Sequence, residues 1–445
     1  MSTVEFAPTA IQIPERPSKW DIIPIHNSDR ATFKFCRRQW AWSSPNRLNL
    51  VPRATVYGMG KSARNLWFGT GIHHALERYY HPGIREDPAV AWETWFNLQW
   101  LGGIVHEDEI KEFVDRNPQA DTHLGNNEFT YKVEGLCDIL PDFGEDNAEV
   151  FLELKDLGVG MMKFYKEYAE AHDNFTVIMV EHDFSVPVLN EKGEPLYAVD
   201  TRVMPEGWEP DFDKGNEFGP LMQESTYGAL MKQVHVRGRQ DQIQQEHEYG
   251  RYGIMDYKTA SRIDEDYFRH LELDEQCTSY LAFGQLEAKL YGLPHKELEY
   301  ITYQAMLKAY PKPPSVTSKG LPSLDRQKEH TTAKLFEKFI LENGLKPLYD
   351  ADEKMQNYYA YLLDLGDKLY IQRNDTWRNA NQRINAMTRL YYEARDMLGN
   401  PVLYPNPNKN FSCINCAFRL PCIQAETGDD FMNTLENGYI QNWDR

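Results

Sequence analysis

An acidic residue and a lysine, separated by one residue, follow an apolar segment in GIMDYKTA at 253–260. Side chains two apart on a β-strand point to the same face, so Asp256 and Lys258 project together and Tyr257 projects to the other side. A carboxylate can bind Mg²⁺, and a nearby amine can orient or deprotonate a water molecule. The apolar residues before the pair predict a buried strand, where charges need a partner or a function. An ordinary ion pair is the alternative, because D-x-K patterns are common.

A second acidic residue, Asp200, ends the apolar segment LYAVD, which is predicted to be a strand. If this strand neighbours the one that carries Asp256, the two carboxylates can bracket one or two divalent ions and polarise a phosphodiester. A competing set consists of Asp138 with the pair Glu153 and Lys155. The residues around that pair predict a helix, in which residues two apart do not share a face, so the set with Asp200 is favoured.

The chain is acidic, with 48 basic and 67 acidic residues among 445 and a net charge of −19. Overall charge therefore does not hold it to nucleic acid, and DNA would require a local basic surface. The segment from Arg30 to His74 contains eight basic residues, no acidic one and interleaved aromatic residues. Basic groups hold phosphates and rings stack on unpaired bases, which predicts a DNA path; an ordinary solvated face is the alternative. The residues assigned to the path are Arg37, Arg38, Trp42, Lys61 and Arg64.

Three of the six cysteines form the pattern C-x2-C-x5-C, at Cys413, Cys416 and Cys422. The sequence shows neither a secretion signal nor an apolar run of about 18 residues, so a cytoplasmic protein without membrane spans is expected. In that compartment cysteines indicate metal binding or burial and not a disulfide framework. Cys137 and Cys277 stand among residues of helical patterning, and we expect both to be packed in the interior.

The elements that would position these residues change in character along the chain. A helix that carries IHHALERYY is predicted to start near Gly71, and β-branched residues predict strands from about 176 onward. Long helices are predicted again over 332–343 and 350–398. The predicted regions are an extended arm (1–27), a helical region (28–175), a strand-rich core (176–310, with an insertion at 205–250), and a C-terminal region of helices and cysteines (311–445).

Five motifs resemble, in their order, those of the PD-(D/E)xK nuclease superfamily, and specifically its RecB-like branch with an iron–sulfur cluster. That branch includes the AddB nuclease domain and the CRISPR-associated RecB-like exonucleases. The chain departs from the family's motifs in two respects. The glycine that usually precedes the acid of the second motif, here Asp200, is replaced by another residue, and the insertion at 205–250 is unusually long. The motifs are GTGIHHALE with His73, LYAVD with Asp200, MDYKTA with Asp256 and Lys258, QCTSY with Gln276 and Tyr280, and Cys36 with the three later cysteines.

The resemblance implies an α/β fold with a restriction-endonuclease-like core, in which helices flank a central mixed sheet. It implies that Lys258 positions the attacking water and that Gln276 and Tyr280 support the site or contact the DNA backbone. Packing within the helix is the alternative for these two residues, and a contact with Glu77 is the alternative for His73. The implied ligands of Mg²⁺ or Mn²⁺ are His73, Asp200, Asp256 and the backbone carbonyl of Tyr257.

For the cysteines, the resemblance implies a [4Fe–4S] cluster held by Cys36, Cys413, Cys416 and Cys422. Four cysteines can also bind Zn²⁺, but zinc sites usually pair two cysteine knuckles, and Cys36 has no second cysteine near it. Such a cluster would join an N-terminal helix to the C-terminal tail in one iron–sulfur lobe, closing a very long stretch of chain.

Together these features predict a metal-dependent DNA exonuclease that acts on ends or single strands in recombination, repair or replication processing. A nuclease fold without activity, serving as a DNA-binding or scaffold subunit, is the alternative, and the set of His73, Asp200, Asp256 and Lys258 argues against it. The chain contains no phosphate-binding G-x-x-x-x-G-K-[ST] motif, so a helicase motor would have to come from a partner.

Overall fold

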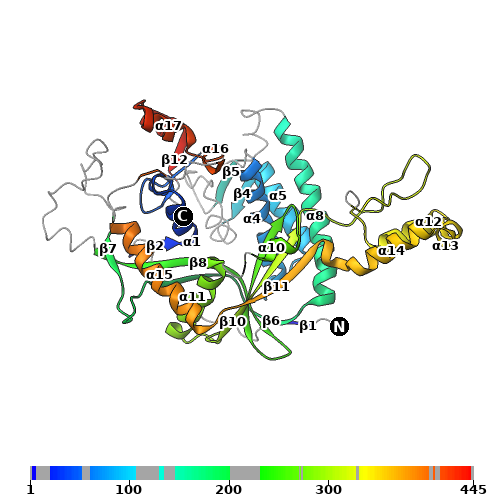
Figure 1. Cartoon of the computed structure of the whole chain (residues 1–445), viewed down its shortest axis with the longest axis horizontal. Coiled ribbons are helices and arrows are strands. Elements are labelled where there is room, and N and C mark those ends of the chain that lie inside the picture. Colours follow the sequence, from blue (N-terminus) through cyan, green and yellow to red (C-terminus); the bar gives the residue numbers. More distant parts are fainter. Residues whose placement is uncertain are drawn as a thin grey trace.

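A mixed β-sheet forms the centre of the protein (Figure 1). The computed structural model describes residues 3–6, 21–52, 61–106, 130–134, 146–200, 231–269, 271, 274–326, 330–399, 404–405 and 411–441. Within these ranges the sheet has eight strands, and the predicted α/β fold with a mixed sheet flanked by helices is confirmed. The strands are β1 (Thr3–Phe6), β2 (Ile22–His26), β6 (Asn174–Pro187), β7 (Tyr197–Val199), β8 (Met231–Glu246), β9 (Tyr252–Ala260), β10 (Leu298–Leu307) and β11 (Ile371–Trp377).

Strand β8 organises the sheet, because four other strands pair with it. Antiparallel β6 follows one edge for most of its length, and β7 continues that edge. The opposite edge pairs with β2 over residues 233–237 and with β9 over 242–245. Parallel β10 and antiparallel β11 extend the sheet beyond β9. The insertion predicted at 205–250 is therefore wrong in its second half, which is a central strand; residues 205–230 lie outside the described ranges.

Helices on one face pack closely around aromatic side chains. They are α4 (Lys61–Tyr80), α5 (Pro88–Leu101) and α8 (Asp146–His172). A Cβ atom at Gly71 would lie 2.4 Å from the Trp95 ring, and one at Gly158 would lie 2.1 Å from Trp92. Only glycine allows these helices to approach so closely. This region was predicted to be mainly helical, but it also contains a two-stranded sheet of β4 (Gly102–His106) and β5 (Thr130–Glu134).

The opposite face is covered by α11 (Glu275–Tyr291) and α15 (Ala380–Gly399), and short α10 (Glu265–Arg269) precedes α11. Residues of β9 alternate between the two faces. Met255 and Tyr257 pack with the helices of the first face, and Ile254 packs with α11. Burial on both sides explains why the part of β9 before Asp256 is apolar.

The segment that follows β2 meets the C-terminal segment at one side of the sheet (Figure 1). Helices α1 (Asn27–Phe35) and α2 (Arg37–Ser43) follow β2, and β3 (Leu50–Pro52) pairs with β12 (Tyr439–Gln441) near the C-terminus. Trp42 and Phe418 share a small hydrophobic cluster that seals this contact. The remaining C-terminal helices are α16 (Phe411–Ile414), α17 (Arg419–Thr427) and α18 (Phe431–Gly438).

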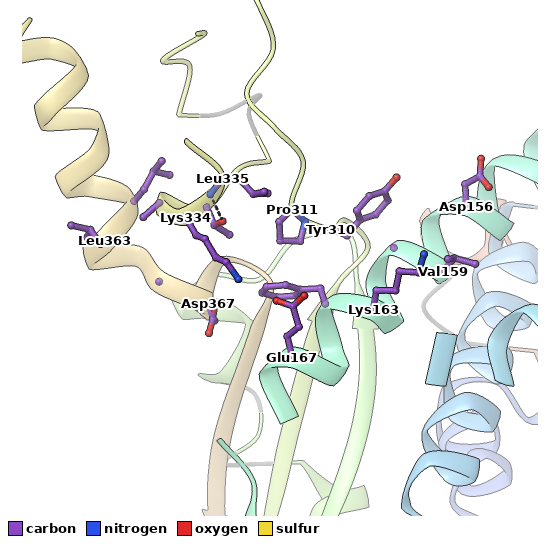
Figure 2. Close-up of a pocket in the computed structure, with 16 residues that line it drawn as sticks. Asp156, Val159, Lys163, Glu167, Tyr310, Pro311, Lys334, Leu335, Leu363 and Asp367 are labelled. Carbon is purple, nitrogen blue, oxygen red and sulfur yellow. Dashed lines mark hydrogen bonds between the residues drawn. The ribbon is translucent and has the colours of Figure 1, made fainter. Parts of the chain in front are cut away.

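An arm of helices projects from the sheet between β10 and β11 (Figure 1). The single helix predicted over 350–398 is wrong, because several shorter helices and strand β11 occupy that range. A cavity of about 690 Å³ lies at the base of the arm, where Lys163 and Glu167 of α8 face Tyr310 and Lys334 (Figure 2). The arm contains α12 (Ala333–Glu342), α13 (Lys346–Ala351), α14 (Glu353–Leu365) and the 3₁₀ helix η4 (Gly366–Leu369).

A buried histidine predicts acid sensitivity of this fold. His295 is fully buried, and within the described residues neither of its ring nitrogens has a hydrogen-bond partner. Burial, followed by the charge of His182, lowers the pKa of His295 to about 3. Below its unfolded pKa near 6.5, the unfolded chain therefore binds a proton that the folded chain does not. The free energy of unfolding should fall by about 1.4 kcal/mol per pH unit from about pH 6.5 down to the folded pKa.

We expect the variant His295→Leu to lose this part of the pH dependence, because leucine does not titrate. Urea unfolding of wild type and variant between pH 7 and pH 5 would measure it. Equal slopes of unfolding free energy against pH in the two proteins would contradict the assignment.

Candidate active site

The candidate active site lies where β8 and β9 separate. The two strands pair over residues 242–245 and 252–255 and then diverge. Asp241 and Asp256 stand at this fork, each one residue beyond the last pair. The backbone N–H of Tyr257 donates a hydrogen bond to Asp241 Oδ2 at 2.7 Å, so the carboxylate of one strand is fixed to the backbone of the other.

His73 of helix α4 approaches this fork from one face of the sheet. Its Nδ1 atom lies 3.4 Å from Asp241 Oδ1 and 4.0 Å from Glu181 Oε1. The ligand atoms of these three residues all lie within 4.8 Å of one another, which is close enough for them to share one metal ion. An imidazole nitrogen with carboxylate oxygens suits Mn²⁺ and related divalent ions.

Glu181 of β6 was not predicted and is held in an unusual backbone conformation. Its φ angle is 45°, in the left-handed region that residues with a side chain rarely adopt. Such strain persists where surrounding contacts enforce it and is concentrated at functional sites. Here Arg239 Nη1 lies 3.6 Å from the Glu181 carboxylate. Its sequence context, VEHDF, carries no signal that separates it from other polar residues in a strand.

The predicted pair of Asp256 and Lys258 does form on β9. Lys258 Nζ lies 2.8 Å from Asp256 Oδ2, and Asp256 is only 2% exposed. Despite this contact, Asp256 Oδ2 is buried and accepts no hydrogen bond of good geometry within the described residues. A buried carboxylate oxygen in this state has unused capacity for a cation.

Electrostatics at the fork favour a bound cation. Burial raises the pKa of Asp256 to about 6, with the charge of Lys258 opposing it, and burial with the charge of Asp241 raises the pKa of Glu181 to about 8. Burial opposes the protonation of His73, but Asp241 outweighs it and raises the pKa of His73 to about 9. Carboxylates crowded in a buried site bind either protons or positive ions. The donor set therefore fits a divalent metal.

Helix α4 is fixed over the fork by a buried polar network. Tyr80, at its C-terminal end, lies within hydrogen-bond distance of Tyr165 of α8 and donates to Asp173 Oδ2. Asp173 Oδ1 also accepts from Arg373 of β11, at 2.6 Å. Arg373 in turn donates to Gln304 of β10. Networks of this kind hold two elements in one geometry, and this one holds the histidine helix against the sheet.

Gln276 and Tyr280 both lie on α11 at the other face of the fork. The carboxylates of Asp256 and Asp241 are near enough to Tyr280 to raise its pKa, although burial is the larger cause. Gln276 donates a hydrogen bond to the Tyr280 hydroxyl. The structure thus brings both predicted residues to the site.

Asp200 is not brought to the site. It forms an ion pair with Lys232, at 2.8 Å, near the end of β7. Val199 pairs with Met231, and Asp241 lies ten positions further along β8 (231 to 241), which corresponds to roughly 30 Å. Asp241 occupies the place predicted for Asp200. A signal was present in the sequence, because Gly238 stands three positions before Asp241, whereas no glycine stands within three positions before Asp200.

The competing set also lies away from the fork. Glu153 and Lys155 are part of helix α8, as their surroundings predicted, and Lys155 pairs with Glu93 of α5 at 2.9 Å. Asp138 and Cys137 lie outside the described residues. Cys277 is 1% exposed and packs in a core cluster between α11 and the sheet, in accord with its predicted burial.

Four cysteines converge where α2 meets the C-terminal helices. Burial raises the pKa of Cys416, and the charges of Cys36, Cys413 and Cys422 raise it further because all three lie near it. The N–H of Gln39 donates to Cys36 Sγ at 3.4 Å, and Arg38 donates to Cys422 Sγ at 3.4 Å. All four thiols are free of disulfide bonds. Four sulfur donors with nearby N–H groups fit a metal centre.

Most of the side chains assigned to the DNA path make contacts within the fold instead of facing solvent. Arg37 pairs with Asp396 at 2.6 Å, and Arg38 pairs with Glu426 at 2.7 Å. Trp42 is buried in the hydrophobic cluster beside Phe418. Arg64 is half-buried on α4, and the side chain of Lys61 lies outside the described part of the structure. The basic stretch therefore meets acidic partners from distant parts of the chain.

Comparison with known proteins agrees with this geometry. A family model of the PD-(D/E)XK nuclease superfamily matches residues 28–422, and the chain therefore belongs to that superfamily. No curated protein gives a significant match to the chain. Within the described ranges, every helix is too short or too polar to cross a membrane.

Proposed function

We propose that the chain is a metal-dependent deoxyribonuclease, an exonuclease that hydrolyses phosphodiester bonds at DNA ends or in single strands. The observation that carries this proposal is the convergence of His73, Asp241, Asp256 and Lys258 on one fork of the sheet. Recombination, repair or replication processing, with a helicase or recombination protein as partner, is the setting in which such an activity would act.

The proposed roles follow from the positions of the side chains. His73, Glu181, Asp241 and Asp256, with the backbone carbonyl of Tyr257, would hold Mg²⁺ or Mn²⁺, which when bound neutralises charge that develops on the phosphate. Lys258, held beside Asp256 in a buried setting, would position the attacking water. Gln276 and Tyr280 would contact the DNA backbone from α11.

We further propose that Cys36, Cys413, Cys416 and Cys422 hold a [4Fe–4S] cluster. A zinc site usually pairs two cysteine knuckles, whereas here one cysteine, Cys36, stands far in sequence from the three others and has no second cysteine near it. This uneven division supports the iron–sulfur cluster over a single zinc ion. Its role would be structural, because it joins α2 to the C-terminal helices.

The proposal predicts cleavage that depends on both metal and Lys258. Wild-type protein should degrade end-labelled single-stranded DNA with Mg²⁺ or Mn²⁺ and stop with EDTA. Lys258→Ala should cleave about 10²-fold more slowly or worse, because a positioned proton-transfer group contributes that much. DNA binding by the variant should persist, since Lys258 is fixed on a rigid strand.

Labelled single-stranded and duplex DNA, resolved on a denaturing gel, would measure these rates and show whether products come from ends. Lys289→Ala is the matched control, because this exposed lysine lies at the far end of α11. Metal-independent cleavage, or wild-type rates in Lys258→Ala, would reject the site. DNA binding without any cleavage by the wild type would favour the inactive scaffold instead.

A further inference from the structure

A second cavity, of about 520 Å³, lies beside the candidate active site. Its walls come from the start of α1, from residues 237–239 of β8 and from the N-terminal turns of α11. The lining includes Gln276 and Tyr280, so the cavity opens next to the fork. Four basic residues line it beside two acidic ones, Asp274 and Glu275, so the cavity is on balance basic in an otherwise acidic protein; the basic residues are Arg30, Lys34, Arg237 and Arg239.

The cavity occupies a break in the pairing of β8. On the edge that β2 and β9 share, β2 pairs as far as Arg237 and β9 begins to pair at Gln242. Between these two residues this edge of β8 has no strand partner within the described chain. An unpaired edge leaves backbone polar groups available to another molecule. Asp241 is the last residue of this break, because pairing with β9 begins at the next residue, Gln242.

Two arginine residues of β8 lie in this region, close to the proposed metal ligands. Arg237 and Arg239 are two residues apart and share a face of the strand. Arg239 is held by Asp183 through two contacts, at 2.7 and 3.1 Å, and its third nitrogen reaches toward Glu181. A guanidinium fixed in this way is already oriented when a phosphate arrives, so little freedom is lost on binding.

We propose that this cavity binds one unpaired nucleotide of the DNA strand, adjacent to the phosphate that is cleaved, with Lys34, Arg237 and Arg239 facing its phosphate. A volume of about 520 Å³ corresponds to a space roughly 8 Å across. A duplex does not fit, since its major groove alone is about 12 Å wide. The proposal rests on the proposed nuclease function and narrows its substrate to single-stranded DNA at this position.

The same cavity explains how an acidic chain can hold DNA although Arg37 and Arg38 are engaged in ion pairs of the fold. Its basic groups come from two segments far apart in sequence, around Lys34 and around Arg239. Lys34 itself is paired with Glu275 at the rim of the cavity and with Glu393 at 3.4 Å, so a bound phosphate would compete with two carboxylates for this amine. Affinity at this site should therefore depend on salt.

The test is binding of a fluorescein-labelled oligonucleotide by the double variant Lys34→Gln/Arg237→Gln, with Ca²⁺ in place of Mg²⁺. Each phosphate contact contributes about −0.7 to the slope of log affinity against log salt concentration for single-stranded DNA. The loss of two contacts should therefore make this slope less negative by about 1.4. Single-strand affinity at moderate salt should fall roughly tenfold, the effect of about 1.4 kcal/mol. Affinity for a blunt duplex should stay as in wild type.

Two controls keep the result interpretable. Lys289→Gln, on the same helix as Tyr280 but outside the cavity, should bind as wild type. Arg237→Lys retains the charge and should retain the salt slope. If the double variant does not fold, Lys34→Gln alone, at an exposed position of α1, should flatten the slope by about 0.7.

Unchanged single-strand affinity and slope in a folded variant would overturn the cavity proposal, even if the wild type cleaves DNA with metal. An equal loss of duplex and single-strand binding would also overturn it. Loss of single-strand binding alone, in a protein that shows no cleavage, would leave the cavity standing and reject the nuclease function. The two proposals can thus fail separately.

Discussion

Asp241→Asn should abolish DNA cleavage, whereas Asp200→Asn should leave it close to the wild-type rate. Asp241 faces His73 and Glu181 through one oxygen and accepts the Tyr257 N–H through the other, so it is central to the proposed metal site. Asparagine preserves shape but removes the charge that binds the cation. Loss of metal assistance worth several kcal/mol corresponds to roughly 10³- to 10⁴-fold in rate.

Cleavage of labelled single-stranded DNA and calorimetric titration with Mn²⁺ would measure the two consequences separately. Asp200→Asn is the matched control, because Asp200 is also a largely buried aspartate, but it forms its ion pair with Lys232 at the far end of β8. If Asp200→Asn were inactive and Asp241→Asn active, the second acid would be the one that the sequence first suggested. Wild-type Mn²⁺ binding by Asp241→Asn would likewise reject the site.

Replacement of Cys416 by serine should remove the iron–sulfur cluster and destabilise the fold. Anaerobically purified wild type should contain about four iron and four sulfide per chain, and the variant almost none. Because the cysteines join α2 to the C-terminal helices, we expect the melting temperature to fall by roughly 5–10 °C, as a loss of about 2–3 kcal/mol produces. Metal and sulfide analysis with thermal melting would check both.

The matched control for this experiment is Cys277→Ala. Cys277 is also buried, but it packs between α11 and the sheet, away from the other four cysteines. This variant should keep its full content of iron while losing some packing energy. About one zinc and no iron in the wild type would reject the cluster and leave a zinc site instead.

The parts of the site that sequence could predict are those within one element. Asp256 and Lys258 share a face because of the period of two in a strand, and the apolar residues before them predicted their burial correctly. The helix that carries His73 was also found from its local pattern. These predictions needed no knowledge of which elements become neighbours.

Predictions that depended on pairing over long distances were less successful. Asp200 follows a strand as expected, but that strand, β7, pairs with the far end of β8. Which acidic residue reaches the site is therefore decided by the pairing of the strands and not by the local sequence pattern. Arg37 and Arg38 stand in a stretch without acids, yet Asp396 and Glu426 meet them in the fold. Local composition cannot reveal a partner more than 350 residues away.

The arm between β10 and β11 has a consequence for how this chain can change over evolution. Its two ends are joined at the sheet, where the Leu307 N–H donates to the Tyr370 carbonyl at 2.7 Å. An inserted segment whose ends already touch can lengthen or shorten at little entropic cost to the host hairpin. The arm is therefore a module that can diverge or be exchanged while the fork, which lies on other strands, keeps its geometry.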